Sequence, residues 1–195
     1  MNEIRCFIAI EIPESIRIKI FRVGQTFQNI QKGEIRWVRP ANIHMTLRFL
    51  GNMGPNELAE MKQILTLAAK RYNPFSISIQ GTGTFPNDHR PRIIWVGSVP
   101  DPVLFELQRD IEKELTKAGY KPENHPFRPH ITIGRVSENL RRERVPQIID
   151  HLSRWQNEVF GNFSVSRIQL FRSDLRQTGP IYSSLFTVNL EPLDD

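Results

Sequence analysis

The chain has 195 residues, 39% of them hydrophobic and 24% charged, an ordinary globular composition that excludes a disordered or low-complexity chain. No apolar run approaches the length of a membrane span, and the single cysteine excludes an internal disulfide, so we expect one compact protein in the reducing cytoplasm. The formal net charge of +5 favours a polyanionic partner, because lysine and arginine release counterions from phosphate backbones.

The first half of the chain alternates strand and helix patterns. The apolar run from Glu3 to Ile12 predicts a buried strand, in which Cys6 is a small core residue rather than a nucleophile. Pro13 then opens a helix with apolar residues at helical spacing up to Ile30. Further elements are the strand "IHMTLRFLG" (43–51), a helix after Pro55, and the strands "FSISIQG" (75–81) and "RIIWVGS" (92–98), which flank the loop "TGTFPNDHRP".

The second half repeats this order. We predict a helix over residues 102–119, the strand "HITIGRV" (130–136) and a helix over about residues 140–155. Two closing strands, "FSVSRIQLFRS" and "YSSLFTVNL", flank the turn "RQTGP". The halves, roughly 14–98 and 102–190, share an 86-residue offset but little sequence, which indicates an internal duplication within a single bilobal domain over 1–195.

The pattern also predicts the fold class. Alternating strands and helices would suit a parallel, doubly wound sheet, but each half ends in two consecutive strands, and the strand patterns leave one sheet face open. We therefore predict an α+β fold with two lobes related by a pseudo-twofold axis. Each lobe has an antiparallel sheet with helices packed outside, and the site lies in a cleft between the lobes.

Two short motifs, "HMTL" at 44–47 and "HITI" at 130–133, occupy matching positions in the halves. Residues two apart on a strand point to the same face, so His44 and Thr46 form one polar pair, and His130 and Thr132 form another. Met45, Leu47, Phe49, Ile131 and Ile133 are expected on the opposite, inward face. If the lobes face each other, the two polar pairs converge on one cleft.

Two histidines suit in-line displacement at phosphorus. With a pKa near 6.5, one imidazole can be neutral and remove a proton while the other is protonated and supplies one. Each threonine hydroxyl can donate to a non-bridging oxygen and stabilise the developing charge. We therefore expect His44 and His130 to be catalytic, Thr46 and Thr132 to bind substrate, and neither a metal nor a cofactor to be needed.

Metal binding is the main competing interpretation of the histidines. The chain lacks the usual zinc motifs, so a third ligand would have to come from the loop residues His125, His89 or Asp88. We expect the two loop histidines to have no catalytic role. His151, near the end of an amphipathic helix, is expected at the surface.

Arginines and aromatic residues are further candidates for substrate binding. Arg48 and Arg128 share the parity of the motif histidines and could help to hold a phosphate, whereas Arg135 falls on the other parity near a strand end. For each of them a solvated surface arginine is an equal alternative. Trp37, Phe127 or Tyr182 could stack on a base, although core packing is the commoner role of such rings.

The chain resembles a known family, the 2H phosphoesterases, and within it the bacterial and archaeal RNA 2′,3′-cyclic phosphodiesterases once called 2′-5′ RNA ligases. The resemblance spans almost the whole chain, through "RCFIAIEIP", "RWVRPANIHMTLRFLG", "PRIIWVG", "FRPHITIGRV" and "LFRSDLRQTGPIYSSL". It implies a bilobal fold and hydrolysis of RNA 2′,3′-cyclic phosphate ends to 2′-phosphate. By this analogy His44 protonates the leaving 3′-oxygen and His130 activates water, although the residues alone do not distinguish these roles.

The resemblance also implies a possible reverse reaction, in which an RNA 5′-hydroxyl replaces water and a 2′-5′ link forms; hydrolysis should dominate because water is plentiful. The expected partners are RNA or nucleotides with 2′,3′-cyclic phosphate ends, with no membrane and no cofactor. One chain already contains both motifs, so we expect a monomer. The alternative function is a non-catalytic module that binds phosphorylated RNA ends, for which arginine and lysine would be more natural than histidine.

Overall fold

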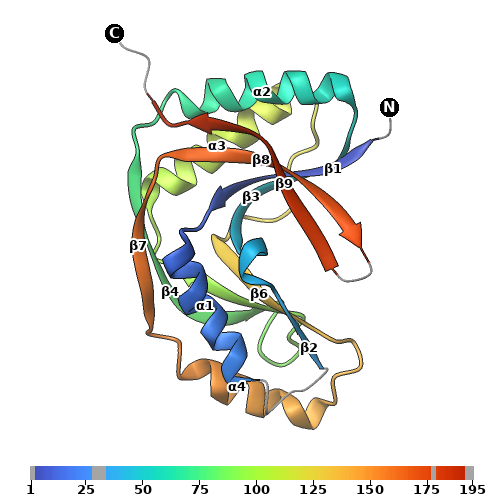
Figure 1. Ribbon diagram of the computed structural model, residues 1–195, viewed down its shortest axis with the longest axis vertical. Helices are drawn as coiled ribbons and strands as arrows, with labels where there is room; N and C mark the ends of the chain where they lie inside the picture. Colours follow the sequence, from blue (N-terminus) through green and yellow to red (C-terminus); the bar gives the residue numbers. More distant parts are fainter. Residues whose placement is uncertain (1–2, 28–33, 177–178, 192–195) are drawn as a thin grey trace.

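The structure, a computed structural model, describes residues 3–27, 34–176 and 179–191. Within them the chain forms nine strands, four α-helices and two short 3₁₀ helices, in two sheets (Figure 1). In chain order the elements are β1 (Ile4–Glu11), α1 (Glu14–Thr26), β2 (Ile35–Trp37), η1 (Pro40–Asn42), β3 (His44–Met53), α2 (Pro55–Ala69), β4 (Phe75–Phe85), β5 (Ile93–Ser98), α3 (Pro102–Lys117), β6 (His130–Val136), η2 (Arg142–Arg144), α4 (Val145–Ser153), β7 (Val159–Val165), β8 (Arg167–Arg176) and β9 (Gly179–Asn189).

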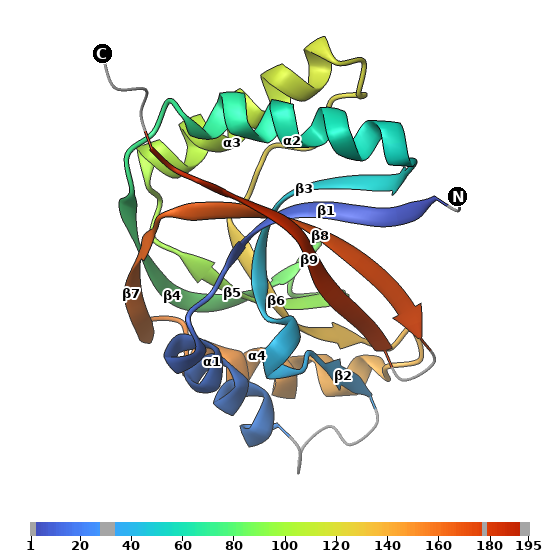
Figure 2. The same ribbon diagram turned by 45° about the horizontal axis from the view of Figure 1, so that its top comes forward.

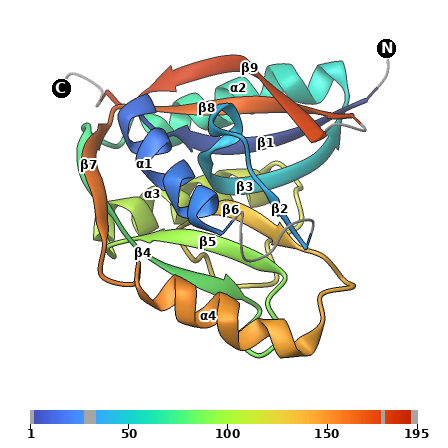
Figure 3. The same cartoon turned by 60° about the horizontal axis from the view of Figure 1, so that its bottom comes forward.

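Both sheets are antiparallel. One has the order β3-β1-β8-β9 (sheet A), and the other has the order β2-β6-β5-β4-β7 (sheet B). The predicted α+β fold with two antiparallel sheets is confirmed, and the parallel alternative is wrong. Helices α2 and α3 lie along the outer side of sheet A, whereas α4 lies against the far side of sheet B (Figures 1 and 3).

Each sheet combines strands from both halves of the sequence. β1 and β3 come from the first half, but their sheet is completed by β8 and β9 from the second half. Conversely, β2, β4 and β5 from the first half form the other sheet together with β6 and β7 from the second half. The exchange interlocks the lobes, and a ribbon formed by β8 and β9 reaches the side of the molecule where β2 lies (Figure 2).

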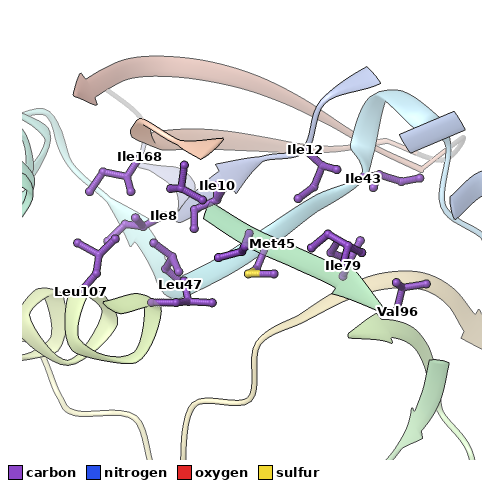
Figure 4. Packing of buried hydrophobic residues seen from close by; sticks show 14 of the residues in the cluster. Ile8, Ile10, Ile12, Ile43, Met45, Leu47, Ile79, Val96, Leu107 and Ile168 are labelled. Atoms are coloured by element: carbon purple, nitrogen blue, oxygen red, sulfur yellow. The ribbon is translucent and has the colours of Figure 1, made fainter. Parts of the chain in front are cut away.

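The buried residues form one apolar cluster that both sheets share. Figure 4 shows Met45 of β3 close to Ile79 of β4 and Val96 of β5, with Leu107 of α3 and Ile8 of β1 nearby. These side chains have exposed fractions of 0%. Because burying one such side chain stabilises a fold by about 1.5 to 3 kcal/mol, this shared core holds the two motif strands in fixed relative positions.

Local chemistry explains where the helices begin. The Asp101 carboxylate accepts a hydrogen bond from the Leu104 backbone N–H at 3.0 Å, and Pro102 takes the first position of α3, where no N–H is needed. At α2, the Glu57 carboxylate accepts a hydrogen bond from the Gly54 N–H at 2.6 Å.

None of the described helices has the combination of length and apolarity that crossing a lipid bilayer requires.

Several predicted boundaries differ from the structure. The predicted loop 82–91 is partly strand, because β4 continues to Phe85 by pairing with β5. "FSVSRIQLFRS" is two strands, which separate at Ser166 to join different sheets. The helix expected over residues 140–155 is shorter, since α4 starts at Val145, and β2 was not expected. The predicted helix position Ile30 and part of the turn "RQTGP" (177–178) lie outside the described residues.

Candidate active site

Both motif strands contain a β-bulge at the last residue of the motif. In β3, Thr46 lies opposite Ala9 but Arg48 lies opposite the next residue, Ile8, so that Leu47 is extra. In β6, Thr132 lies opposite Trp95 and Gly134 lies opposite Ile94, which makes Ile133 the extra residue. A bulge resets which residues face each side of a sheet. In each strand the last motif residue and the residue after it are therefore both buried, and the next residue, Phe49 or Arg135, points to the side of the motif histidine.

The bulge in β3 overturns two predictions. Arg48 does not face a phosphate site: it is buried, and its guanidinium lies 3.2 Å from Glu112 Oε1 and 2.6 Å from Glu123 Oε1. It also donates a hydrogen bond to the Lys121 carbonyl. Phe49, expected to pack inward, is 54% exposed and lines the cleft. Strict alternation fails here because the extra residue shifts the register by one.

The four motif residues line the same cleft, which has a volume of about 250 Å³. Sheet A supplies His44 and Thr46, and sheet B supplies His130 and Thr132. The other residues that line it come mainly from β2, η1 and the start of β9, and are Arg36, Trp37, Val38, Arg39, Asn42, Phe49, Ile93, Arg135, Gly179, Pro180 and Tyr182. The arrangement brings two imidazoles and two hydroxyls to one small space.

The two histidines are oriented in the same way. His44 Nδ1 lies 2.7 Å from the Asn42 carbonyl oxygen, and His130 Nδ1 lies 2.7 Å from the Arg128 carbonyl oxygen. A carbonyl only accepts, so each Nδ1 must carry the hydrogen, and in the neutral ring Nε2 is then the proton acceptor. The Asn42 side chain also donates to the Pro180 carbonyl at 2.8 Å, which ties this end of β3 to β9.

Aromatic rings hold both imidazoles in place. The His44 ring centroid lies 4.8 Å from that of Phe7 and 5.1 Å from that of Tyr182, which it meets edge-on. His130 meets Phe85 edge-on at 4.9 Å. Such contacts restrict ring rotation, so that each Nε2 is held in a fixed direction.

Burial makes both histidines harder to protonate than the sequence suggested. The pKa of His44 is lowered from 6.5 to about 4, mainly by burial, with smaller contributions from Arg135 and His130, and the hydrogen bond to the Asn42 carbonyl opposes this shift. Burial also lowers the pKa of His130, with a smaller contribution from Arg135. The expectation of pKa values near 6.5 is therefore wrong, and in the free protein both rings are neutral at pH 7.

The positive charges at the cleft are mostly not those that the sequence suggested. Arg135 lines it, because the bulge in β6 brings this residue to the same side as His130. Arg36 and Arg39 also line it and were missed; their signal is the segment "RWVRP" (36–40), which is separated from the first motif by three residues. Arg128 does not line it, and its guanidinium lies 6.0 Å from the ring centre of Phe85.

Two of the three aromatic candidates line the cleft. Tyr182 lies beside His44, and Trp37 forms part of the wall. The Trp37 indole packs so closely over Gly24 and Gly134 that a Cβ at either position would lie 2.9 or 3.0 Å from it. Phe127 instead packs edge-on against Phe105, with ring centroids 5.8 Å apart.

The remaining histidines lie elsewhere. His89 and His125 are exposed in loops, as expected. His151 is not simply a surface residue, because its Nε2 lies 2.7 Å from Thr26 Oγ1 and its ring packs edge-on against Phe27 at 4.1 Å. Asp88 accepts a hydrogen bond from Thr84.

In residues 3–27, 34–176 and 179–191, no group of three or more His, Cys, Asp or Glu side chains is placed to share a metal ion.

Two antiparallel sheets, each contributing a His-x-Thr pair to a shared cleft, define the class of two-histidine (2H) phosphoesterases. Comparison with known families agrees, since the model of the 2′-5′ RNA ligase superfamily matches residues 22–177. The chain belongs to this superfamily.

Two relatives match along nearly their whole length. The RNA 2′,3′-cyclic phosphodiesterase of Methanothermobacter thermautotrophicus is 35% identical over 184 residues, which cover 94% of this chain and 97% of the relative. A protein of the same name from Aquifex aeolicus is 32% identical over 185 residues, covering 94% and 95%.

Solved structures show the same fold. TT0787 of Thermus thermophilus superposes with a TM-score of 0.80 at 24% identity, covering 97% of this chain and 100% of that one. E. coli LigT complexed with 3′-AMP superposes with a TM-score of 0.71 at 26% identity, covering 96% and 98%.

Proposed function

We propose that this protein is an RNA 2′,3′-cyclic phosphodiesterase that opens the cyclic phosphate at an RNA end to a 2′-phosphate. The observation that carries the proposal is the convergence of His44 and His130 on one cleft with their Nδ1 atoms hydrogen-bonded in the same way. The names of the relatives support the same activity.

The proposed chemistry uses only groups that line the cleft. Water attacks phosphorus opposite the 3′-oxygen, one histidine removes a proton from that water, and the other gives a proton to the 3′-oxygen as the P–O3′ bond breaks. The Thr46 and Thr132 hydroxyls donate to the non-bridging oxygens, where charge develops. Because the histidines themselves supply acid and base, we expect no dependence on a metal ion, and EDTA should leave the rate unchanged.

The lowered pKa values make protonation depend on substrate. A phosphodiester carries a negative charge, which raises the pKa of nearby imidazoles and allows one of them to gain a proton on binding. The pH profile of kcat/KM reports the free enzyme and that of kcat reports the complex. We therefore expect two bell-shaped profiles, with the kcat/KM optimum below about pH 6.5, the ordinary pKa of histidine, and the kcat optimum at a higher pH.

We assign His44 as the acid and His130 as the base, following the family resemblance. His44→Ala and His130→Ala should each lower hydrolysis of a cyclic phosphate by several orders of magnitude. An aryl phosphodiester such as a nucleoside p-nitrophenyl phosphate separates the roles, because nitrophenolate leaves without needing a proton. His44→Ala should recover most of its rate on that substrate and His130→Ala should not; the reverse result would exchange the assignments.

The deciding assay is incubation of the protein with a nucleoside 2′,3′-cyclic phosphate, with the product identified as the 2′- or 3′-phosphate. Full activity in either alanine variant would refute the two-histidine mechanism. Binding of RNA ends without any ring opening would favour the alternative, a non-catalytic end-binding module. In the reverse reaction, an RNA 5′-hydroxyl would replace water and join two RNA ends through a 2′-5′ link, at a lower rate than hydrolysis. Since one chain supplies both motifs, we propose that a monomer suffices.

A further inference from the structure

A row of polar side chains continues the cleft-lining face of sheet A beyond the cleft. β1 is regular between Arg5 and Phe7, so the two side chains share a face, and Phe7 packs on the His44 ring. A second bulge in β3, at Leu50, leaves Phe49 opposite Phe7 and Asn52 opposite Arg5. Arg5 and Asn52 are both exposed and therefore form the next row outward.

The spacing of this row matches a chain of phosphates. Two residues along a strand span about 7 Å, so Arg5 lies about one nucleotide step further out than Phe7. This is close to the separation of successive phosphates in an extended single strand. Thr46 lies opposite Ala9, four residues or about 13 Å from Arg5, and the Phe7 ring, which packs on His44, lies between them. An RNA that leaves the cleft along this face would therefore bring its preceding phosphate towards the Arg5 side chain.

The charges around the mouth of the cleft also favour an extended anion. Burial raises the pKa of Tyr182, and the positive charges of three arginines, Arg135, Arg5 and Arg36, act in the opposite direction. Since such an effect requires proximity, the three guanidiniums lie near this one phenol. Arg36 and Arg135 are directly opposite each other on β2 and β6, where like charges destabilise a sheet. None of the three forms an ion pair with a carboxylate among the described residues. An anion with more than one charge would relieve this repulsion.

Exposed apolar side chains lie at the mouth of the cleft and at the end of the β8–β9 ribbon. Phe49, at the mouth of the cleft, is 54% exposed, and Leu175 is 68% exposed at the end of the β8–β9 ribbon, opposite Pro180. Figure 2 shows this ribbon reaching out over the side on which β2 lies. Exposed rings beside arginines are the pattern by which proteins bind single-stranded nucleic acid.

We propose that Arg5, assisted by Asn52, forms a subsite for the phosphate on the 5′ side of the terminal nucleotide. This inference rests on the proposed function and adds a preference to it: the enzyme acts on a cyclic phosphate that has a second phosphate upstream. A cyclic mononucleotide lacks that phosphate and uses the cleft alone.

The test compares three substrates with the same base. They are the nucleoside 2′,3′-cyclic phosphate, its 5′-phosphorylated form, and a dinucleotide that ends in the cyclic phosphate. We expect the wild type to have a kcat/KM at least about 10-fold higher for the second and third substrates, as for one charge-assisted contact. Arg5→Gln should remove this preference while leaving kcat/KM for the first substrate unchanged, and Arg5→Lys should keep part of it.

The matched control is Arg154→Gln, which removes the same charge from the end of α4 on the far side of sheet B and should keep the preference. Equal kcat/KM for all three substrates in the wild type, or an equal loss on all three in Arg5→Gln, overturns the subsite and leaves the proposed function intact. No turnover of any of the three by the wild type overturns the proposed function itself, and the subsite with it.

Discussion

Replacing Arg48 with methionine should destabilise the protein strongly, although Arg48 lies outside the cleft. The side chain is 8% exposed, and it binds Glu112 from α3 and Glu123 from the segment that leads to β6. It thereby connects the strand of the first motif to the chain that precedes the second. Methionine fills a similar volume, so the main change is the loss of the positive charge.

The magnitude follows from the burial of the partners. Removing one member of a buried ion pair costs about 3 to 5 kcal/mol, because a buried charge is left without compensation. Glu112 is 19% exposed and gains partial hydration, whereas Glu123 is 43% exposed and contributes little. We therefore expect Arg48→Met to lower the free energy of unfolding by about 2 to 4 kcal/mol.

The assay is urea unfolding followed by circular dichroism at about pH 7.5 and about pH 5, above and near the titration range of a raised carboxyl pKa. Burial raises the pKa of Glu112 and Arg48 opposes this, so the variant should raise that pKa further above its unfolded value. The penalty of a raised carboxyl pKa is present at high pH and disappears as the group is protonated. The deficit of Arg48→Met should therefore shrink from the higher pH to the lower one.

Two further variants make this reasoning refutable. Arg48→Met/Glu112→Gln should regain part of the lost stability, because it removes the uncompensated carboxylate. Arg154→Met breaks an ion pair in which the side chains are 67% and 72% exposed, and should cost less than about 0.5 kcal/mol. If Arg48→Met is as stable as Arg154→Met, or the double variant is less stable than the single one, the ion-pair network does not stabilise the fold as argued.

Three other predictions concern the cleft. Because the pKa of His44 is lowered in the folded state, the unfolded chain binds a proton at this residue at a higher pH than the folded protein does. The free energy of unfolding should therefore fall between pH 6.5 and pH 4 by about 2 to 3 kcal/mol more in the wild type than in His44→Gln. Urea midpoints that change with pH by the same amount in both proteins would contradict this. Gly134→Ala should lower the free energy of unfolding by about 1 to 3 kcal/mol and raise KM, because the added Cβ would lie 3.0 Å from Trp37. The control is Gly54→Ala, where the nearest atom is 3.5 Å away, and this variant should lose less than about 1 kcal/mol. Thr46→Val and Thr132→Val should each lower kcat roughly 10- to 1000-fold with little change in stability, and an unchanged kcat would exclude that hydroxyl as a phosphate donor.

The sequence was most informative where the relevant geometry is local. His44 and Thr46 point to the same face of the sheet because they are two residues apart on one strand, and the same holds for His130 and Thr132. The class of fold followed from the order of strand and helix patterns, which is also local. These features needed no knowledge of which strands pair.

Features that depend on pairing could not be predicted in this way. The bulges at Leu47 and Ile133 exist only relative to the neighbouring strands, so the burial of Arg48 and the exposure of Phe49 were missed. The placement of β4 and β5 in one sheet and of β8 and β9 in the other is likewise a long-range choice. The depressed histidine pKa values arise from burial by rings on other strands, which no motif encodes.

The paired bulges also make the two walls of the cleft differ, although the two motifs that line it match. The 86-residue offset that relates the histidines also relates Phe49 to Arg135, and the bulge in each strand brings both residues to the cleft. The two histidine positions are thus equivalent, but one wall carries a phenyl ring and the other a guanidinium. We expect a substrate whose two sides differ to fit this cleft better in one orientation than in the reversed one, and this difference would give the two histidines distinct roles.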